Sequence, residues 1–128
     1  MRHRAALHLF PVLVLVLTGC ASTPAEPTNP NFKPCLDFEE AATNLIMSFT
    51  PEGNGLSFEV ELRNIESASR DAEGDVKDAM NRAADLMPSA GDQMMNSEDR
   101  SRASSLIQAV ANACEAEGVG ISPTTWVN

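Results

Sequence analysis

Residues 56–87 read LSFEVELRNIESASRDAEGDVKDAMNRAADLM, and this stretch decides the predicted fold. Small and apolar side chains recur in it at intervals of three and four residues, which places them on one face of a helix. The stripe consists of Leu62, Ile65, Ser69, Ala72, Val76, Ala79, Ala83 and Leu86. Gly74 costs a helix up to about 1 kcal/mol, but the spacing does not change across it. We therefore expect one long helix over 56–87, with at most a bend at Gly74. The opening letters LSFEVEL alternate as a strand would, but the longer stripe favours a helix.

Two shorter helices are predicted around this stretch. Residues 36–49 carry apolar side chains at helical spacing and are followed by the turn sequence TPEGNG. Towards the other end, Asn96 or Ser97 can cap a helix that has acidic residues in its first turn and ends at Gly118. The sequence therefore predicts an all-α domain over 35–128, a small three-helix bundle with one long central helix.

The chain begins with a segment typical of an export signal. Arg2 and Arg4 precede the thirteen-residue apolar run AALHLFPVLVLVL, which is shorter than a membrane span of about 20 residues. The run leads into a short motif that resembles the lipobox of bacterial lipoproteins, Leu17-Thr18-Gly19-Cys20. The resemblance implies that 1–19 is a signal peptide cleaved between Gly19 and Cys20, and that Cys20 carries fatty-acyl chains such as palmitate. It implies a domain anchored on the outer, extracytoplasmic face of a bacterial cell membrane. The alternative is a buried free cysteine after an ordinary signal peptide.

Residues 20–34 are predicted to be the lipidated cysteine and a disordered tether. Proline recurs every three or four residues, at Pro24, Pro27, Pro30 and Pro34. This spacing disfavours helix and favours an extended polyproline conformation, which rises about 3.1 Å per residue. Residues 21–34 would then reach about 43 Å from the membrane.

The exported part of the chain lacks the charge and the side chains that several functions need. Without Arg2 and Arg4 it keeps seven basic and 18 acidic side chains, a net charge of −11 that repels nucleic acid. Both histidines, His3 and His8, precede Cys20, and the chain has no tyrosine. Ser-His-Asp and Cys-His catalytic groups and His-ligated zinc, copper or haem sites are therefore excluded beyond Cys20. We expect no enzymatic activity and no cofactor.

The two remaining cysteines, Cys35 and Cys114, are predicted to form a disulfide, the default in an oxidising compartment. In a three-helix bundle, the start of the first helix and the end of the third lie at opposite ends. A central helix of about 48 Å resolves this conflict, because the two cysteines can then meet near its middle. The alternative, two free thiols that bind a metal, lacks further ligands.

Four acidic residues lie close together in the sequence, at Asp71, Glu73, Asp75 and Asp78. A calcium-binding EF-hand loop starting at Asp71 would need a glutamate at its twelfth position, where Arg82 stands. We therefore interpret these residues as the solvated face of a helix. The spacing of the other carboxylates considered does not indicate a catalytic acid–base pair. These residues are Glu39, Glu40, Glu59, Glu61 and Glu66.

Four methionines, Met80, Met87, Met94 and Met95, could in principle hold copper(I), because thioethers are soft ligands. Met80 and Met87 are one heptad apart, as core residues are, and methionine readily fills irregular gaps. We expect a structural role and no metal site. The single tryptophan, Trp126, is expected to close the bundle as a plug; the alternative is an exposed anchor for a partner.

These features together predict a membrane-anchored lipoprotein of the cell envelope that acts as a non-enzymatic binding or interaction module. Its partners would be the membrane, through the lipid on Cys20, and an envelope protein or a small ligand. The alternative is a carrier of a small apolar ligand or soft metal between the helices. A carrier would have a cavity lined by Val76, Met80, Met87 and Ile107.

Overall fold

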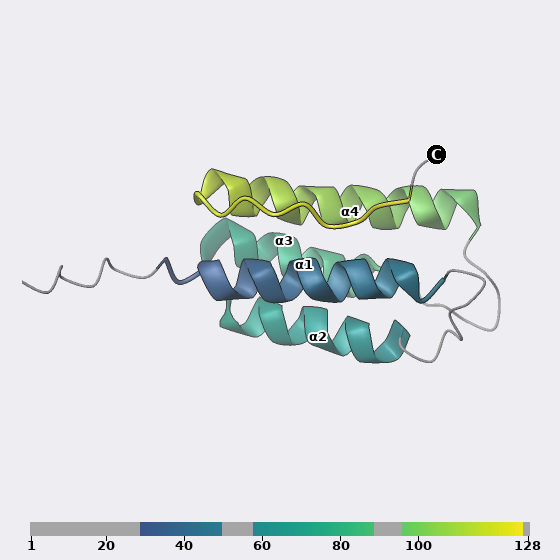
Figure 1. Cartoon of the computed structure of the whole chain (residues 1–128), viewed down its shortest axis with the longest axis horizontal. Helices are drawn as coiled ribbons and strands as arrows, with labels where there is room; N and C mark the ends of the chain where they lie inside the picture. The colour runs from purple at the N-terminus through teal and green to yellow at the C-terminus, as the bar shows by residue number, and fades with distance from the viewer. Residues whose placement is uncertain (1–28, 50–57, 89–95, 127–128) are drawn as a thin grey trace, which may run out of the picture.

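The computed structural model describes residues 29–49, 58–88 and 96–126. Within these ranges the chain forms four helices and no strand, so the expected all-α fold is confirmed (Figure 1). The helices are α1 (Phe32–Met47), α2 (Phe58–Asp71), α3 (Gly74–Leu86) and α4 (Ser97–Ala116). The predicted signal peptide and Cys20 lie outside the described residues. No helix of the described part is long and apolar enough to cross a membrane.

The prediction of one long helix over 56–87 is wrong, because the chain reverses direction between α2 and α3. Ala72 and Glu73 connect the two helices, and Gly74 opens α3 with a φ of +57°. Glycine adopts this left-handed conformation without the steric cost that a Cβ atom imposes. An unbroken helix of about 48 Å would extend far beyond α1, which is about 24 Å long, and would expose half of its apolar stripe. The reversal buries most of both halves of the stripe against one core, but Leu86, which was expected on the buried face, is 54% exposed.

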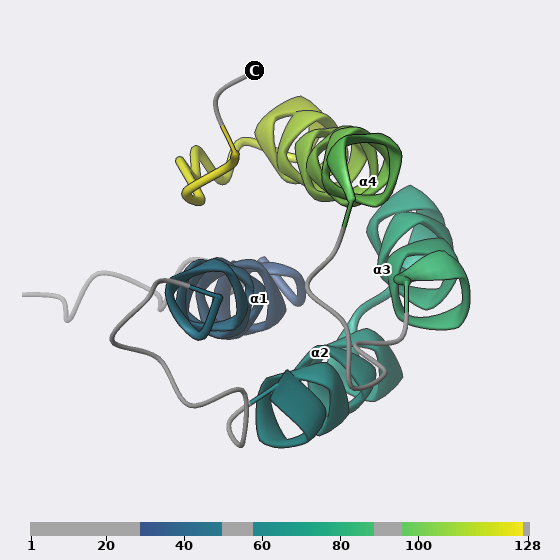
Figure 2. The same cartoon turned by 90° about the vertical axis from the view of Figure 1, so that its right-hand side faces the viewer.

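The four helices alternate in direction and form an up-down-up-down bundle (Figure 1). Each helix packs on the next one in the chain, and α1 and α4 make a looser contact that closes the bundle. Figure 2 shows the helices in sequence order around the core, with the C-terminal segment lying alongside α1 and α4. The connection from α2 to α3 and the chain ends at Phe32 and Ala116 therefore lie at one end of the molecule.

The core combines a few large side chains with many alanines. The largest fully buried side chains include Phe38, Leu45, Phe58, Ile65, Met80 and Ile107. Small residues such as Ala42, Ala83 and Ala103 are completely buried between them, which lets neighbouring helices approach closely. One contiguous cluster joins all four helices.

The folded domain begins earlier than the sequence indicates. Helix α1 starts at Phe32, three residues before the expected domain boundary at Cys35. Pro34 lies in the first turn of α1, where a helix does not need the missing backbone N–H, and it is buried. Residues 29–34, which were predicted to be part of a tether, therefore belong to the folded domain. The start of α4 agrees with the prediction, since the Asn96 side chain accepts a hydrogen bond from the Asp99 N–H.

Candidate functional site

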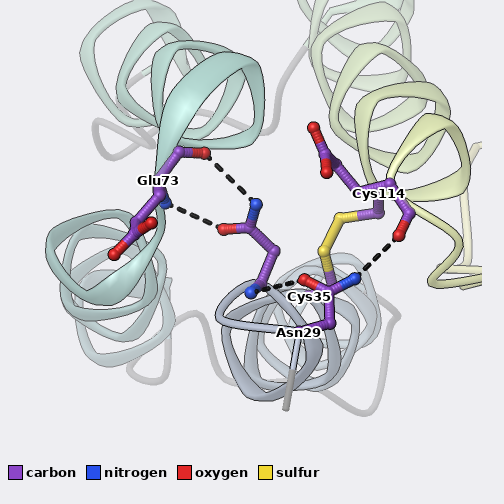
Figure 3. Close-up of a disulfide and its surroundings, with 6 residues drawn as sticks. Asn29, Cys35, Glu73 and Cys114 are labelled. Carbon is purple, nitrogen blue, oxygen red and sulfur yellow. Dashed lines mark hydrogen bonds between the residues drawn. A yellow bond between two sulfur atoms is a disulfide. The ribbon is translucent and has the colours of Figure 1, made fainter. Parts of the chain in front are cut away.

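The predicted disulfide between Cys35 and Cys114 is confirmed, and it ties the first turn of α1 to the last turn of α4 (Figure 3). The two Cα atoms lie 6.0 Å apart and both residues are completely buried. The reason for their proximity differs from the predicted one. With four helices of alternating direction, the start of the first and the end of the last meet at the same end, so no offset along a long helix is needed.

A buried asparagine joins the start of α1 to the connection between α2 and α3. The Oδ1 atom of Asn31 accepts a hydrogen bond from the Glu73 N–H at 2.8 Å, and its Nδ2 donates to the Glu73 carbonyl at 3.3 Å. Asn31 is only 4% exposed. The side-chain amide of Asn31 therefore bonds both backbone groups of Glu73, accepting from its N–H and sharing its carbonyl with the Lys77 N–H.

Asn29 extends this arrangement to the end of α4. Its Nδ2 donates to the Glu117 carbonyl at 2.7 Å, and its Oδ1 accepts from the Asn31 N–H at 2.9 Å (Figure 3). We call the set of Asn29, Asn31, Glu73 and the disulfide the stapled end. The chain that leads to Cys20 leaves the domain here, nine residues after that cysteine.

A polar groove of about 250 Å³ runs between α1 and α2. Carboxylates and amides supply most of its polar lining, at Asp37, Glu40, Asn44, Glu61 and Asn64. Glu61 is 9% exposed and its Oε2 accepts a hydrogen bond from the Asn64 side chain at 3.0 Å. Lys33 forms an exposed ion pair with Asp37, and the hydrogen bond and charge of Asp37 raise the pKa of the Lys33 ammonium.

The sequence did not predict this groove. Neither the spacing of Glu40 nor that of Glu61 indicated a shared site, yet Glu61 is buried beside Asn64. The polar residues on each helix recur three and four positions apart, which was the available signal. That signal has meaning only once α1 and α2 are known to be neighbours.

The other residues considered from the sequence take structural positions. Val76, Met80 and Ile107 are completely inaccessible to water, and Met87 is 6% exposed. No void that could hold a water molecule therefore borders the first three side chains. Met94 and Met95 lie outside the described residues.

The four acidic residues of the 71–78 segment are exposed, but they surround a turn and do not form the face of one continuous helix. Asp71 ends α2, Glu73 takes the N-cap position of α3 without a side-chain cap bond, and Asp75 lies in the first turn of α3, where the helix dipole favours a negative charge. Among the described residues, no three His, Cys, Asp or Glu side chains are grouped so that they could hold a metal ion.

Trp126 closes the bundle, as expected of a plug. Its ring is partly buried and meets the Phe49 ring edge-on, with centroids 5.7 Å apart. Phe49 in turn contacts Phe58 in the same way at 5.2 Å. The three rings link the C-terminal segment to α2 at the end of the bundle opposite the stapled end.

Cys20 and Gly19, the predicted lipidation and cleavage positions, lie outside the described residues. Comparison of the chain with protein-family models, curated proteins and solved structures found no match.

Proposed function

We propose that this protein is a lipid-anchored module of the bacterial cell envelope that binds a partner and catalyses no reaction. The lipobox-like motif at Leu17–Cys20 supports a lipid anchor on Cys20. The position of Asn29 at the stapled end supports the expectation that this end of the domain faces the membrane. Only eight residues, 21–28, separate Cys20 from Asn29, so the anchored domain would stand within about 30 Å of the membrane surface.

The burial of Val76, Met80 and Ile107 is the observation that favours a binding module over a carrier. A carrier would need a cavity beside these side chains, and water does not reach them. Opening a ligand-sized cavity there would cost several kcal/mol of lost packing. A soft metal would need thioethers that are free to coordinate, whereas Met80 is enclosed by the core.

The α1–α2 side of the molecule is the surface that we assign to the partner. The groove offers the carboxylates of Asp37, Glu40 and Glu61, and the same two helices expose the apolar side chains of Leu36 and Val60. A basic segment with adjacent apolar residues is complementary to such a surface in charge and in character.

Cross-linking in intact cells tests this assignment. Full-length protein should capture a partner, and Glu40→Lys should reduce the captured amount because it reverses a charge in the groove. Asp78→Lys, an exposed position on α3, is the matched control and should leave capture unchanged. Equal capture by all three forms would contradict the assignment of the partner to this surface.

The anchor is tested separately by labelling cells with a palmitate analogue. The natural chain should incorporate the label, Cys20→Ala should lose it, and Ser22→Ala should retain it. Label that persists in Cys20→Ala would contradict lipidation at Cys20, whatever the cross-linking shows.

A further inference from the structure

One carboxylate in the polar groove between α1 and α2 is buried without a counter-charge. Glu61 is 9% exposed, yet in the described part of the chain no basic side chain forms an ion pair with it. Its Oε2 atom accepts from Asn64, and its Oε1 atom has no donor among the described residues. No described side-chain oxygen is both unbonded and sealed from solvent, so Oε1 opens into the groove that Glu61 lines. Because an uncompensated buried carboxylate is costly, Glu61 is placed to receive a cation from outside the chain.

The shape of the groove suits one long side chain. Helices α1 and α2 run in opposite directions, so Asn44 lies at the same end of the groove as Glu61, and Asp37 lies at the other end (Figure 1). Asp37 and Asn44 are seven residues apart, which makes this part of α1 about 10 Å long. Ala41 and Ala68 also line the groove, and both are only 2% exposed. A narrow groove with small apolar side chains along it and a carboxylate at one end fits an alkyl stem that carries a cationic group.

The acceptors at the Glu61 end favour a guanidinium group over an ammonium group. Asp37 is already paired with Lys33, whereas Glu40 and Glu61 have no basic partner in the described ranges. Asn44 can add a carbonyl oxygen beside Glu61. Arginine presents five N–H donors in one plane and is more weakly hydrated than lysine, which presents three donors on a compact charge. Several acceptors around a partly buried carboxylate therefore match arginine better.

We propose that the groove binds one arginine side chain, and that this is the group by which the partner is held. The alkyl stem would lie along Ala41 and Ala68, and the guanidinium group would donate to Glu61 Oε1. Asn64 acts as a positioning residue, because its hydrogen bond to Oε2 fixes the orientation of the Glu61 carboxylate. The inference rests on the proposed function, since it names the chemical group that the α1–α2 surface recognises in its partner.

A titration of the full-length protein with small probes tests the arginine site without the unidentified partner. The probes are N-acetyl-arginine methylamide and N-acetyl-lysine methylamide, each of which carries a single cationic side chain on an uncharged backbone. Binding is followed by two-dimensional NMR of the amide groups, with the protein in a non-ionic detergent. The side-chain amides of Asn44 and Asn64 line the groove, so their signals report contact with the probe directly.

The arginine probe should bind about fivefold more tightly than the lysine probe, because its planar fork meets several acceptors at once. The largest shifts should fall on the residues of α1 and α2 that line the groove. Glu61→Gln keeps the length of the side chain and an acceptor for Asn64 but removes the charge, so it should weaken binding of the arginine probe by about tenfold. Glu66→Gln, at an exposed position on α2 outside the groove, is the matched control and should bind the probe as the natural chain does.

Equal affinities for the two probes would overturn the inference, and so would shifts that spread over the acidic surface of all four helices. Both results come from the natural chain, so they apply even if Glu61→Gln fails to fold. An equal effect of Glu61→Gln and Glu66→Gln would overturn the inference as well.

The cross-linking experiment separates this inference from the proposed function. If Glu40→Lys lowers capture of the partner but the natural chain shows no preference for the arginine probe, the arginine site is wrong and the partner surface stands. If the arginine probe binds at Glu61 but Glu40→Lys captures as much partner as the natural chain, the arginine site stands and the assignment of the partner to this surface is wrong.

Discussion

Removal of the disulfide is the perturbation whose magnitude the structure sets most directly. Cys35 and Cys114 are 79 residues apart in sequence, so the bond closes a loop of about 80 residues in the unfolded chain. Chain-entropy arithmetic for such a loop gives about 4.5 kcal/mol at 25 °C. Small domains are stable by about 5–15 kcal/mol in total, so the Cys35→Ala/Cys114→Ala variant should lose a large share of its stability.

Equilibrium unfolding in urea, followed by circular dichroism, measures this loss. With a urea dependence of about 1.5–2 kcal/mol per molar, the midpoint should fall by about 2–3 M. The natural chain equilibrated in urea with a reductant should show nearly the same fall, since it keeps both side chains and loses only the bond. Reductant added to the folded protein should act slowly, because both cysteines are completely buried.

The comparison between these two samples separates the bond from the packing of the two side chains. A loss below about 2 kcal/mol in the reduced natural chain would refute the loop-entropy reasoning. Such a result would mean that the unfolded chain has little conformational entropy left for the disulfide to remove, or that core packing alone holds α1 against α4. A large loss in the alanine variant with a small loss in the reduced chain would assign the effect to packing.

Three smaller changes test other parts of the fold by the same urea assay or by fluorescence. Asn31→Ala should destabilise the domain by about 1–2 kcal/mol, because the Glu73 N–H loses its partner and the Glu73 carbonyl keeps only the bond from the Lys77 N–H; a loss under 0.5 kcal/mol would contradict that role. Gly74→Ala should cost about 1–2 kcal/mol because of its positive φ, whereas Gly120→Ala, which has no such conformation, should change the stability little; equal effects would be the contrary result. Phe49→Ala should shift the emission of Trp126, the only tryptophan, to longer wavelength, since the ring loses its edge-on partner; unchanged emission would show that the plug does not depend on that contact.

Local patterns were enough to predict α1 and α4 as separate helices. The apolar spacing located the buried faces of α1 and α4. Asn96 marked the start of α4, because asparagine is a common N-cap residue and its cap depends only on the next few residues. Cys35 and Cys114 could be paired by elimination, since the predicted export would make a disulfide their default state. These predictions depend on residues close in sequence or on the expected compartment. They do not require knowledge of how the helices pack.

The reversal at Gly74 shows why periodicity alone failed in the middle of the chain. Both α2 and α3 must turn an apolar face towards the same core, so the stripe keeps its spacing whether the helix continues or folds back. The local free-energy cost of placing glycine inside a helix is only about 1 kcal/mol, so the glycine alone does not decide between a continuous helix and a turn. The burial of a whole apolar face, which depends on the lengths of α1 and α4, is worth far more and decides the outcome.

The sequence by itself thus determined the helical class, the acidic charge, the pairing of Cys35 with Cys114, and the absence of histidine beyond the predicted leader. Only the tertiary structure decided which residues meet across elements. These meetings are the hydrogen bonds between Asn31 and Glu73, the polar groove between α1 and α2, and the packing of residues 119–126 along α1 and α4. The physical reason is one of range. Helical periodicity and caps act within a few residues, whereas these arrangements join positions on different helices and form only after the direction of each helix is fixed.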